Sequence, residues 1–280
     1  MSDVLFRALF DDAALFPPGN APMGVALPAH RAHRAGPHAP HVGPFLVSAA
    51  RVTELHSVLA REEDSPGPLT TVVTAPGGAD AIATAVEAAR ADPALRLVGL
   101  ETTAAPGGVP EVLAQLRRHL PDGVEAFVEI SREGDACADL AVLRDTGHNA
   151  KFRTGGVKAE AHPTETELAA LLSTAVAFEL PFKCTAGLHH AVRHTTAEGF
   201  EQHGFLNVLL ATAALLDGAG PEDVAHVLAD RDGPALARTA GALDDTDADN
   251  IRATFRSFGT CSISEPLEDL VTLGVLPTTR

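Results

Sequence analysis

Two short segments in the second half of the chain each carry a lysine at a place suited to chemistry. They read NAKFRTGG from residue 149 and PFKCTAG from residue 181. In a β-strand, successive side chains point to opposite faces. Lys151 and Arg153 therefore share one face, and so do Lys183 and Thr185, while phenylalanines on the other face suit packing under helices. If the two strands are neighbours in a barrel, both lysines point into it, from strands about 4.8 Å apart.

A close pair of lysines has a chemical use. A free lysine titrates near pH 10.4 and is almost never nucleophilic at neutral pH. Two ammonium groups about 5 Å apart at an effective dielectric constant near 20 repel by roughly 3 kcal/mol, about two pKa units. We therefore expect one lysine to approach neutrality and to form a Schiff base with a carbonyl. The alternative is that Lys151 and Lys183 simply pair with Glu101 or Glu129, which end two earlier strands.

Histidines follow the second lysine closely, at His189, His190, His194 and His203. His189 or His190 can serve as a general acid or base, or as a metal ligand together with a glutamate. No HxH or HExxH spacing supports a metal site, so we expect neither metal nor cofactor. A solvated polar loop is the plainer interpretation of this segment.

An anion site is the other expectation at the strand ends, because backbone N–H groups and an arginine fork bind carboxylate or phosphate. A glycine pair is also a common end to a strand, so this interpretation stays open. The residues expected to bind substrate are Arg153, Thr154, Gly155, Gly156, Thr185, His190 and Ser262.

These side chains must be positioned by regular elements, and short apolar runs alternate with amphipathic stretches along the chain. The expected strands are 13–16, 45–48, 69–74, 95–101, 124–130, 149–154, 181–186 and 255–263. The expected helices between them are 28–35, 52–63, 79–91, 109–120, 135–145 and 164–178. This alternation predicts a single (β/α)8 TIM barrel over residues 1–280. The stretch from 199 to 254 is too long for one crossover and predicts extra helices before the last strand, over 200–216, 221–230, 234–243 and 248–254.

Three residue patterns, taken in order, resemble the deoxyribose-phosphate aldolase superfamily of class I aldolases. The Lys151-Phe-Arg-Thr-Gly155 segment is similar to the family's Lys-x-x-Thr-Gly strand, which carries the Schiff-base lysine. The segment from Phe182 to Gly187 resembles the strand with the second lysine, and 256–262 resembles the last strand. The resemblance covers short pieces of the C-terminal half, and a His-His pair replaces a glycine after the second lysine. It implies a barrel and a nucleophilic Lys151, with Glu101 in place of the family's aspartate.

Composition narrows the classes of partner. The chain has 280 residues, 45% of them hydrophobic, and a formal charge of −16. Nucleic acid and anionic membranes need a basic surface, so neither is an expected partner. No long apolar run and no signal-peptide pattern is present. Three widely spaced cysteines indicate reduced thiols and a cytoplasmic location.

Three functional hypotheses follow. The first is a Schiff-base-forming lyase or aldolase acting on a small carbonyl substrate with an anionic group. The second is a metal-dependent barrel lyase or hydrolase that uses the histidine-rich loop. The third is a barrel that binds a ligand without catalysis. Substrate identity, and whether the chain forms a homo-oligomer, are left open. Asp11 and Asp12 come just before the first expected strand, where capping is their expected role; the alternative is that they reach the site if the strand lies elsewhere.

Overall fold

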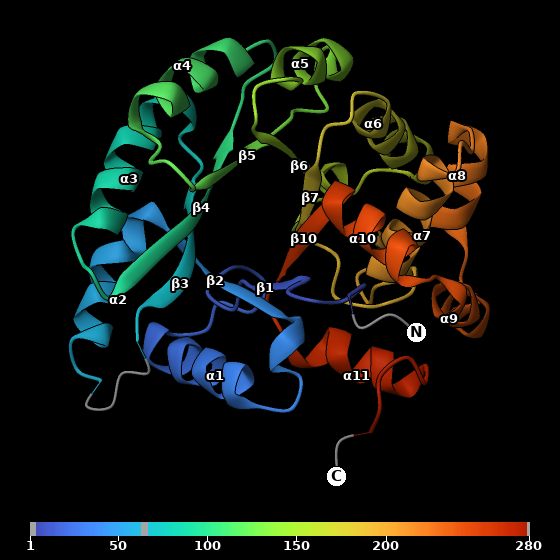
Figure 1. Cartoon of the computed structure of the whole chain (residues 1–280), viewed down its shortest axis with the longest axis horizontal. Helices are drawn as coiled ribbons and strands as arrows, with labels where there is room; N and C mark the ends of the chain where they lie inside the picture. Colours follow the sequence, from blue (N-terminus) through green and yellow to red (C-terminus); the bar gives the residue numbers. More distant parts are fainter. Residues whose placement is uncertain (1–3, 63–66, 279–280) are drawn as a thin grey trace.

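The computed structural model describes residues 4–62 and 67–278, and within them eight parallel strands close into a barrel. The order around the barrel is β1-β10-β7-β6-β5-β4-β3-β2, and Figure 1 shows helices arranged outside it. The expected (β/α)8 fold is confirmed. The strands are β1 (Phe10–Asp12), β2 (Val42–Ser48), β3 (Leu69–Ala75), β4 (Leu95–Thr103), β5 (Glu125–Glu129), β6 (Asn149–Arg153), β7 (Phe182–Thr185) and β10 (Phe255–Thr260).

One helix follows most strands and covers the outer face of the sheet. These helices are α1 (Met23–Ala35), α2 (Val52–Leu59), α3 (Ile82–Arg90), α4 (Val109–His119), α5 (Ala136–Leu143), α6 (Glu165–Ala177) and α11 (Ser264–Thr272). Their starts follow local rules: Thr164 and Glu167 form a capping box at the start of α6, which satisfies N–H groups that have no partner within the helix.

The chain between β7 and β10 departs from the simple alternation. It contains a short antiparallel hairpin of β8 (His194–Thr195) and β9 (Glu201–Gln202). Four helices follow: α7 (Phe205–Leu216), α8 (Pro221–Ala229), α9 (Gly233–Ala242) and α10 (Asp245–Thr254). Figure 1 shows this group gathered on one side of the barrel, beside α6. The prediction of extra helices before the last strand is confirmed.

Alternation along the strands separates two buried regions. On β2 and β3, Val47 and Val73 belong to the large cluster under the helices. The residues before them, Leu46 and Val72, form a separate small cluster with Ala13. Successive strand residues face opposite sides, so this small cluster fills one side of the barrel lumen. The other side of the lumen is left to β4, β5, β6 and β7.

Several expected boundaries are wrong. The first strand is Phe10–Asp12 and not 13–16, so the two aspartates lie within it and do not cap it. Helix α1 begins at Met23, which places Pro28 inside the helix and not at its start. The expected end of the second helix at residue 63 lies outside the described residues.

None of the helices in residues 4–62 and 67–278 combines the length and apolar character that crossing a membrane requires.

Candidate functional site

The register of three neighbouring strands brings the two lysines side by side. Glu129 at the end of β5 pairs in register with Lys151 on β6, which pairs with Lys183 on β7. Phe152 and Phe182 take the opposite face, where their ring centroids lie 5.5 Å apart in the outer core. Both lysines therefore face the lumen, as alternation predicts. The whole chain contains three lysines, so two of the three lie inside the barrel.

Five charged side chains form what we call the lumen network: Asp11, Glu101, Glu129, Lys151 and Lys183. Glu101 stands between the two lysines, with Oε1 2.6 Å from Lys183 Nζ and Oε2 2.8 Å from Lys151 Nζ. Lys183 also donates a hydrogen bond to Asp11, and Lys151 Nζ lies 2.9 Å from Glu129 Oε2. Each lysine therefore contacts two carboxylates. Pairing of the lysines with carboxylates is the alternative to mutual repulsion that we considered from the sequence.

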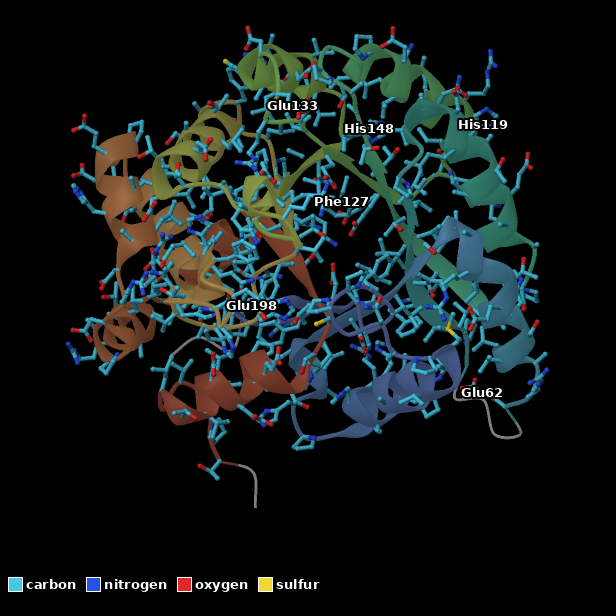
Figure 2. The ribbon with its side chains drawn as sticks, turned by 180° about the vertical axis from the view of Figure 1, so that it is seen from behind. Glu62, His119, Phe127, Glu133, His148 and Glu198 are labelled. Carbon is cyan, nitrogen blue, oxygen red and sulfur yellow. The ribbon has the colours of Figure 1, made fainter. Side chains whose placement is uncertain are left out.

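The network is exposed unequally. Lys183 is completely buried and its ammonium lies 5.1 Å from the centroid of the Phe127 ring. Figure 2 shows Phe127 among the side chains in the interior of the barrel. Lys151 retains 6% exposure, and next to it Arg153 Nε donates a 2.9 Å hydrogen bond to Glu129 Oε1. Arg153 is exposed and ends β6, so it lies at the carboxyl ends of the strands, where barrel enzymes hold their active sites.

The electrostatics differ from those expected of a repelling pair. Burial alone lowers the pKa of Lys151, but Glu101 and Glu129 outweigh it and the net pKa is raised. The pKa of Lys183 is likewise raised, because Asp11 and Glu101 outweigh burial. The expected activation of one lysine by the other is therefore wrong for the resting protein. Sequence spacing shows two neighbouring ammonium groups but not the carboxylate between them.

The pKa values of two of the three network carboxylates are shifted downward. Burial alone raises the pKa of Glu101, but the two lysines outweigh it and bring the pKa to about 2. The pKa of Glu129 is also lowered, since Lys151 and Arg153 outweigh its burial. Asp11 is the exception: burial outweighs Lys183 and raises its pKa. Asp11 is therefore the carboxylate of the network closest to taking up a proton.

Asp11 reaches the network, which was the alternative to its expected capping role, and Ser257 is a functional candidate that sequence reasoning missed. Ser257 on β10 donates a 2.7 Å hydrogen bond to the Asp11 Oδ2 that also accepts from Lys183. The neighbouring Asp12 faces outward, 3.0 Å from Nδ1 of the buried His30 on α1. Two adjacent aspartates give no hydrophobic pattern, and no local signal shows that one of them lies inside the barrel.

The expected anion segment is packed against the end of β7. The Thr154 hydroxyl donates to the carbonyls of Thr185 and Ala186. A side chain at Gly155 would meet the backbone of Gly187 at 2.8 Å, so this glycine allows two strand ends to approach. Gly156 accepts a hydrogen bond from His162 through its carbonyl. Within the segment from Arg153 to Gly156, Arg153 is the exposed residue.

Two histidines after β7 pair with carboxylates of α11. His189 Nδ1 lies 3.2 Å from Glu265 Oε2 and 3.6 Å from the sulfur of Cys261. His190 Nδ1 lies 3.1 Å from Asp269 Oδ2. Cys261 follows β10 and does not lie within it.

Ser262 adjoins this group, and its hydroxyl accepts a hydrogen bond from the backbone N–H of Glu265. Burial lowers the pKa of His189 despite its carboxylate partner. Over residues 4–62 and 67–278, no group of three or more His, Cys, Asp or Glu side chains is arranged to hold a metal ion.

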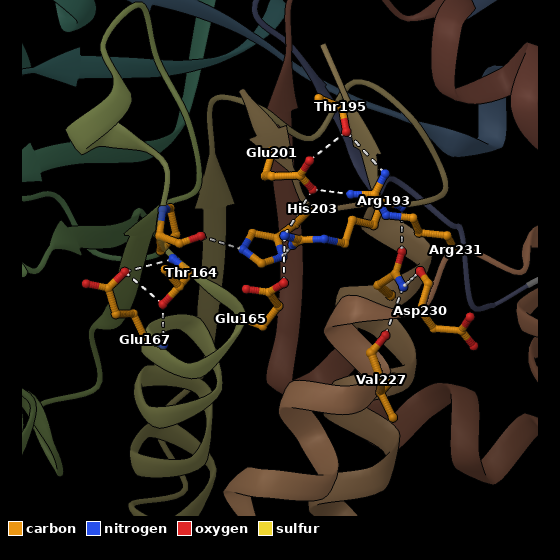
Figure 3. A network of polar contacts seen from close by, with 12 residues as sticks. Thr164, Glu165, Glu167, Arg193, Thr195, Glu201, His203, Val227, Asp230 and Arg231 are labelled. Atoms are coloured by element: carbon orange, nitrogen blue, oxygen red, sulfur yellow. Dashed lines mark hydrogen bonds and ion pairs between the residues drawn. The ribbon is translucent and has the colours of Figure 1, made fainter. Parts of the chain in front are cut away.

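The buried Arg193 connects the β8–β9 hairpin to α6 through ion pairs, as Figure 3 shows. Arg193 Nη2 lies 2.7 Å from Glu165 and 3.2 Å from Glu201. Its Nη1 lies 3.3 Å from Nδ1 of His203, whose Nε2 lies 2.8 Å from the carbonyl oxygen of Pro163. An arginine only donates, so His203 accepts at Nδ1 and donates at Nε2, which is the neutral form. Its lowered pKa, caused mainly by burial, agrees with this assignment.

The chain matches no protein-family model and no curated protein sequence.

Proposed function

We propose that this protein is a Schiff-base-forming lyase of the class I aldolase type, acting on a small carbonyl substrate with an anionic group. One observation carries the proposal: the two lysines share Glu101, but only Lys151 retains exposed surface, 6% against 0% for Lys183. Lys151 is therefore the nucleophile in the proposal, and Lys183 is the buried cation that keeps Glu101 charged. The resemblance of the strand around Lys151 to the aldolase pattern supports the same assignment.

The residues around Lys151 have roles in this chemistry. Glu101 or Glu129 takes a proton from the ammonium, and the amine attacks the carbonyl carbon and loses water to give an iminium. The adjacent carbon–carbon bond then breaks, its electron pair forms an enamine, and a carboxylate takes the hydroxyl proton of the departing carbonyl fragment. Protonation of the enamine and hydrolysis return the free lysine. The reverse sequence joins the two fragments.

Arg153 is suited to the anionic group. It contributes only its Nε to Glu129 among the contacts of the described residues, which leaves both Nη groups for a carboxylate or phosphate. Its side chain is 46% exposed, so a ligand at the carboxyl ends of the strands reaches it.

A second candidate, a ligand-binding barrel without Schiff-base chemistry, is favoured by the same network. Both lysines are paired and their pKa values are raised, which keeps both amines protonated at rest. The two candidates differ in whether a carbonyl compound becomes bonded to Lys151.

Borohydride trapping distinguishes them. The protein is incubated with acetaldehyde, acetone or pyruvate across pH 6 to 10, reduced, and analysed by peptide mass. Lys158 is exposed and reports non-specific reaction within the same chain. Enzymatic imine formation predicts an adduct on Lys151 that exceeds the adduct on Lys158 and is lost in Lys151→Met. Labelling of Lys158 alone, with every carbonyl compound, would contradict the lyase proposal and favour the ligand-binding candidate.

A further inference from the structure

A cavity of about 520 Å³ opens at the end of the barrel opposite Arg153. Glu125 is the first residue of β5, and Arg256 and Ser257 lie near the start of β10, so this is the amino end of the strands. The cavity is lined by Val4, Arg7, Ala8, Asp11, Pro44, Val72, Val98, Gly123, Glu125, Phe127, Arg252, Arg256 and Ser257.

The cavity carries a surplus of positive charge in a chain whose formal charge is −16. Three arginines line it, and one of them, Arg256, is paired with Glu125 at 2.7 Å. Arg7 is exposed, and neither it nor Arg252 forms an ion pair with a carboxylate in the part of the chain that the structure describes. Arg252 instead donates to three main-chain carbonyls, those of Phe255, Arg7 and Arg256.

Those carbonyls hold the Arg252 guanidinium in place without neutralising it. Burial, against the opposing attraction of Asp11 and with a smaller contribution from Arg256, lowers the pKa of Arg252 to about 10. A cation that is desolvated and fixed, and that forms no direct ion pair among the described residues, is stabilised by an anion that comes near it. Barrel ends of this kind usually contribute to stability, but a buried Arg252 that forms no ion pair among the described residues does not add to stability.

The deeper wall of the cavity is mainly apolar. Val72 belongs to the small apolar cluster in the lumen, and Val98 packs against that cluster. Phe127 presents its ring between this cavity and Lys183, whose ammonium lies over it. Asp11 reaches the same wall from β1. A ligand that fits here has an apolar body for the wall and an oxyanion for the arginines at the rim.

We propose that the amino-terminal mouth of the barrel is a binding site for a small organic anion, a carboxylate or phosphate ester with an apolar or aromatic group. Arg7, Arg252 and Arg256 bind the oxyanion, and Val72, Val98 and Phe127 contact the body. The site is separate from Lys151 and does not depend on the proposed lyase activity.

Isothermal titration calorimetry with the whole protein tests the site directly. Phenyl phosphate and benzoate are the probes, which separate a phosphate head from a carboxylate head. We expect saturable binding of at least one probe, and weaker binding of inorganic phosphate and of benzyl alcohol, since each lacks one half of the ligand. Arg7→Gln should weaken binding about fivefold, equivalent to ~1 kcal/mol, and Arg256→Gln should act in the same direction.

Two further variants sharpen the test. Glu125→Gln removes the carboxylate that competes for Arg256, so it should tighten binding, whereas Arg7→Gln and Arg256→Gln should weaken it. Arg51→Gln is the matched control, because Arg51 is also an arginine paired with a glutamate, Glu54, but does not line the cavity. It should leave the affinity unchanged.

The proposal is overturned if neither probe binds saturably, or if Arg51→Gln abolishes binding while Arg7→Gln does not. Arg7 is exposed and contributes no side-chain hydrogen bond within the described residues, so Arg7→Gln is expected to fold normally, which circular dichroism checks. Binding is measured without a reaction, and failure here leaves the trapping experiment on Lys151 unaffected.

Discussion

Replacing Glu129 with glutamine tests whether carboxylates, and not the neighbouring ammonium, set the reactivity of Lys151. Glu129 Oε2 lies 2.9 Å from Lys151 Nζ, and two unit charges at that separation attract by roughly 6 kcal/mol at an effective dielectric constant near 20. That value is an upper bound, because Glu129 also faces Arg153 and its side chain is 13% exposed. We expect about a third of it, ~2 kcal/mol, to appear as a lowered pKa of Lys151, which is about a 30-fold gain in free amine.

Reductive methylation with formaldehyde and cyanoborohydride, read by peptide mass from pH 6 to 10, measures this gain. The rate at Lys151 is divided by the rate at Lys158 in the same molecules, which cancels differences in reagent. In the unmodified chain Lys151 should react more slowly than Lys158 at pH 7, since its pKa is raised by Glu101 and Glu129. In Glu129→Gln the ratio should rise about 30-fold.

Glu133→Gln provides the control. Glu133 is exposed and Figure 2 shows it on the outside of the barrel, so this variant removes a glutamate charge without touching the lumen network. It should leave the ratio unchanged. If Glu129→Gln leaves the ratio of Lys151 to Lys158 unchanged or lowers it while circular dichroism shows a folded protein, the electrostatic reasoning fails.

Three further outcomes follow from the structure. Because the lumen lysines hold the pKa of Glu101 at about 2 against an ordinary 4.5, its contribution to stability is present above about pH 4.5 and is lost as pH falls toward 2. Urea unfolding should show a loss of about 3 kcal/mol across that window, and an equally steep loss in Glu101→Gln would contradict the assignment. Gly187→Ala should destabilise the fold by about 1–3 kcal/mol, because φ is +78° and the new Cβ would meet the Thr154 carbonyl oxygen at 2.8 Å; an unchanged thermal midpoint would count against this. Arg193→Met leaves Glu165 without its 2.7 Å partner and should speed amide hydrogen exchange in the β8–β9 hairpin, while equal exchange in both proteins would show that the hairpin is held by other contacts.

The orientation of the lysines could be predicted because β6 and β7 each carry a clear alternation. Phe152 and Phe182 require the outer core, so the residues beside them must face inward. The two expected glutamate partners were also within reach, since each ends an apolar run that reads as a strand. The local alternation of apolar and polar residues is sufficient to predict side-chain orientation wherever a strand has one strongly apolar face.

Asp11 could not be found in this way, because β1 is three residues long and two of them are aspartates. What allows Asp11 to be buried is Lys183, which lies 172 positions away along the chain. The raised pKa values of the lysines have the same origin: Glu101 lies between them only once the barrel has closed. Ion-pair partners that meet only when the barrel closes cannot be identified from the spacing of residues along the sequence.

The lumen network also divides its charges by position along the chain. Its carboxylates, Asp11, Glu101 and Glu129, all precede residue 130, and its ammonium groups, Lys151 and Lys183, all follow residue 150. Neither half of the chain alone can neutralise the charges that it would place in the lumen, and an unpaired buried charge is costly. The two halves should therefore fold together as one cooperative unit, and a newly made N-terminal half must wait for the last strands before its interior can close.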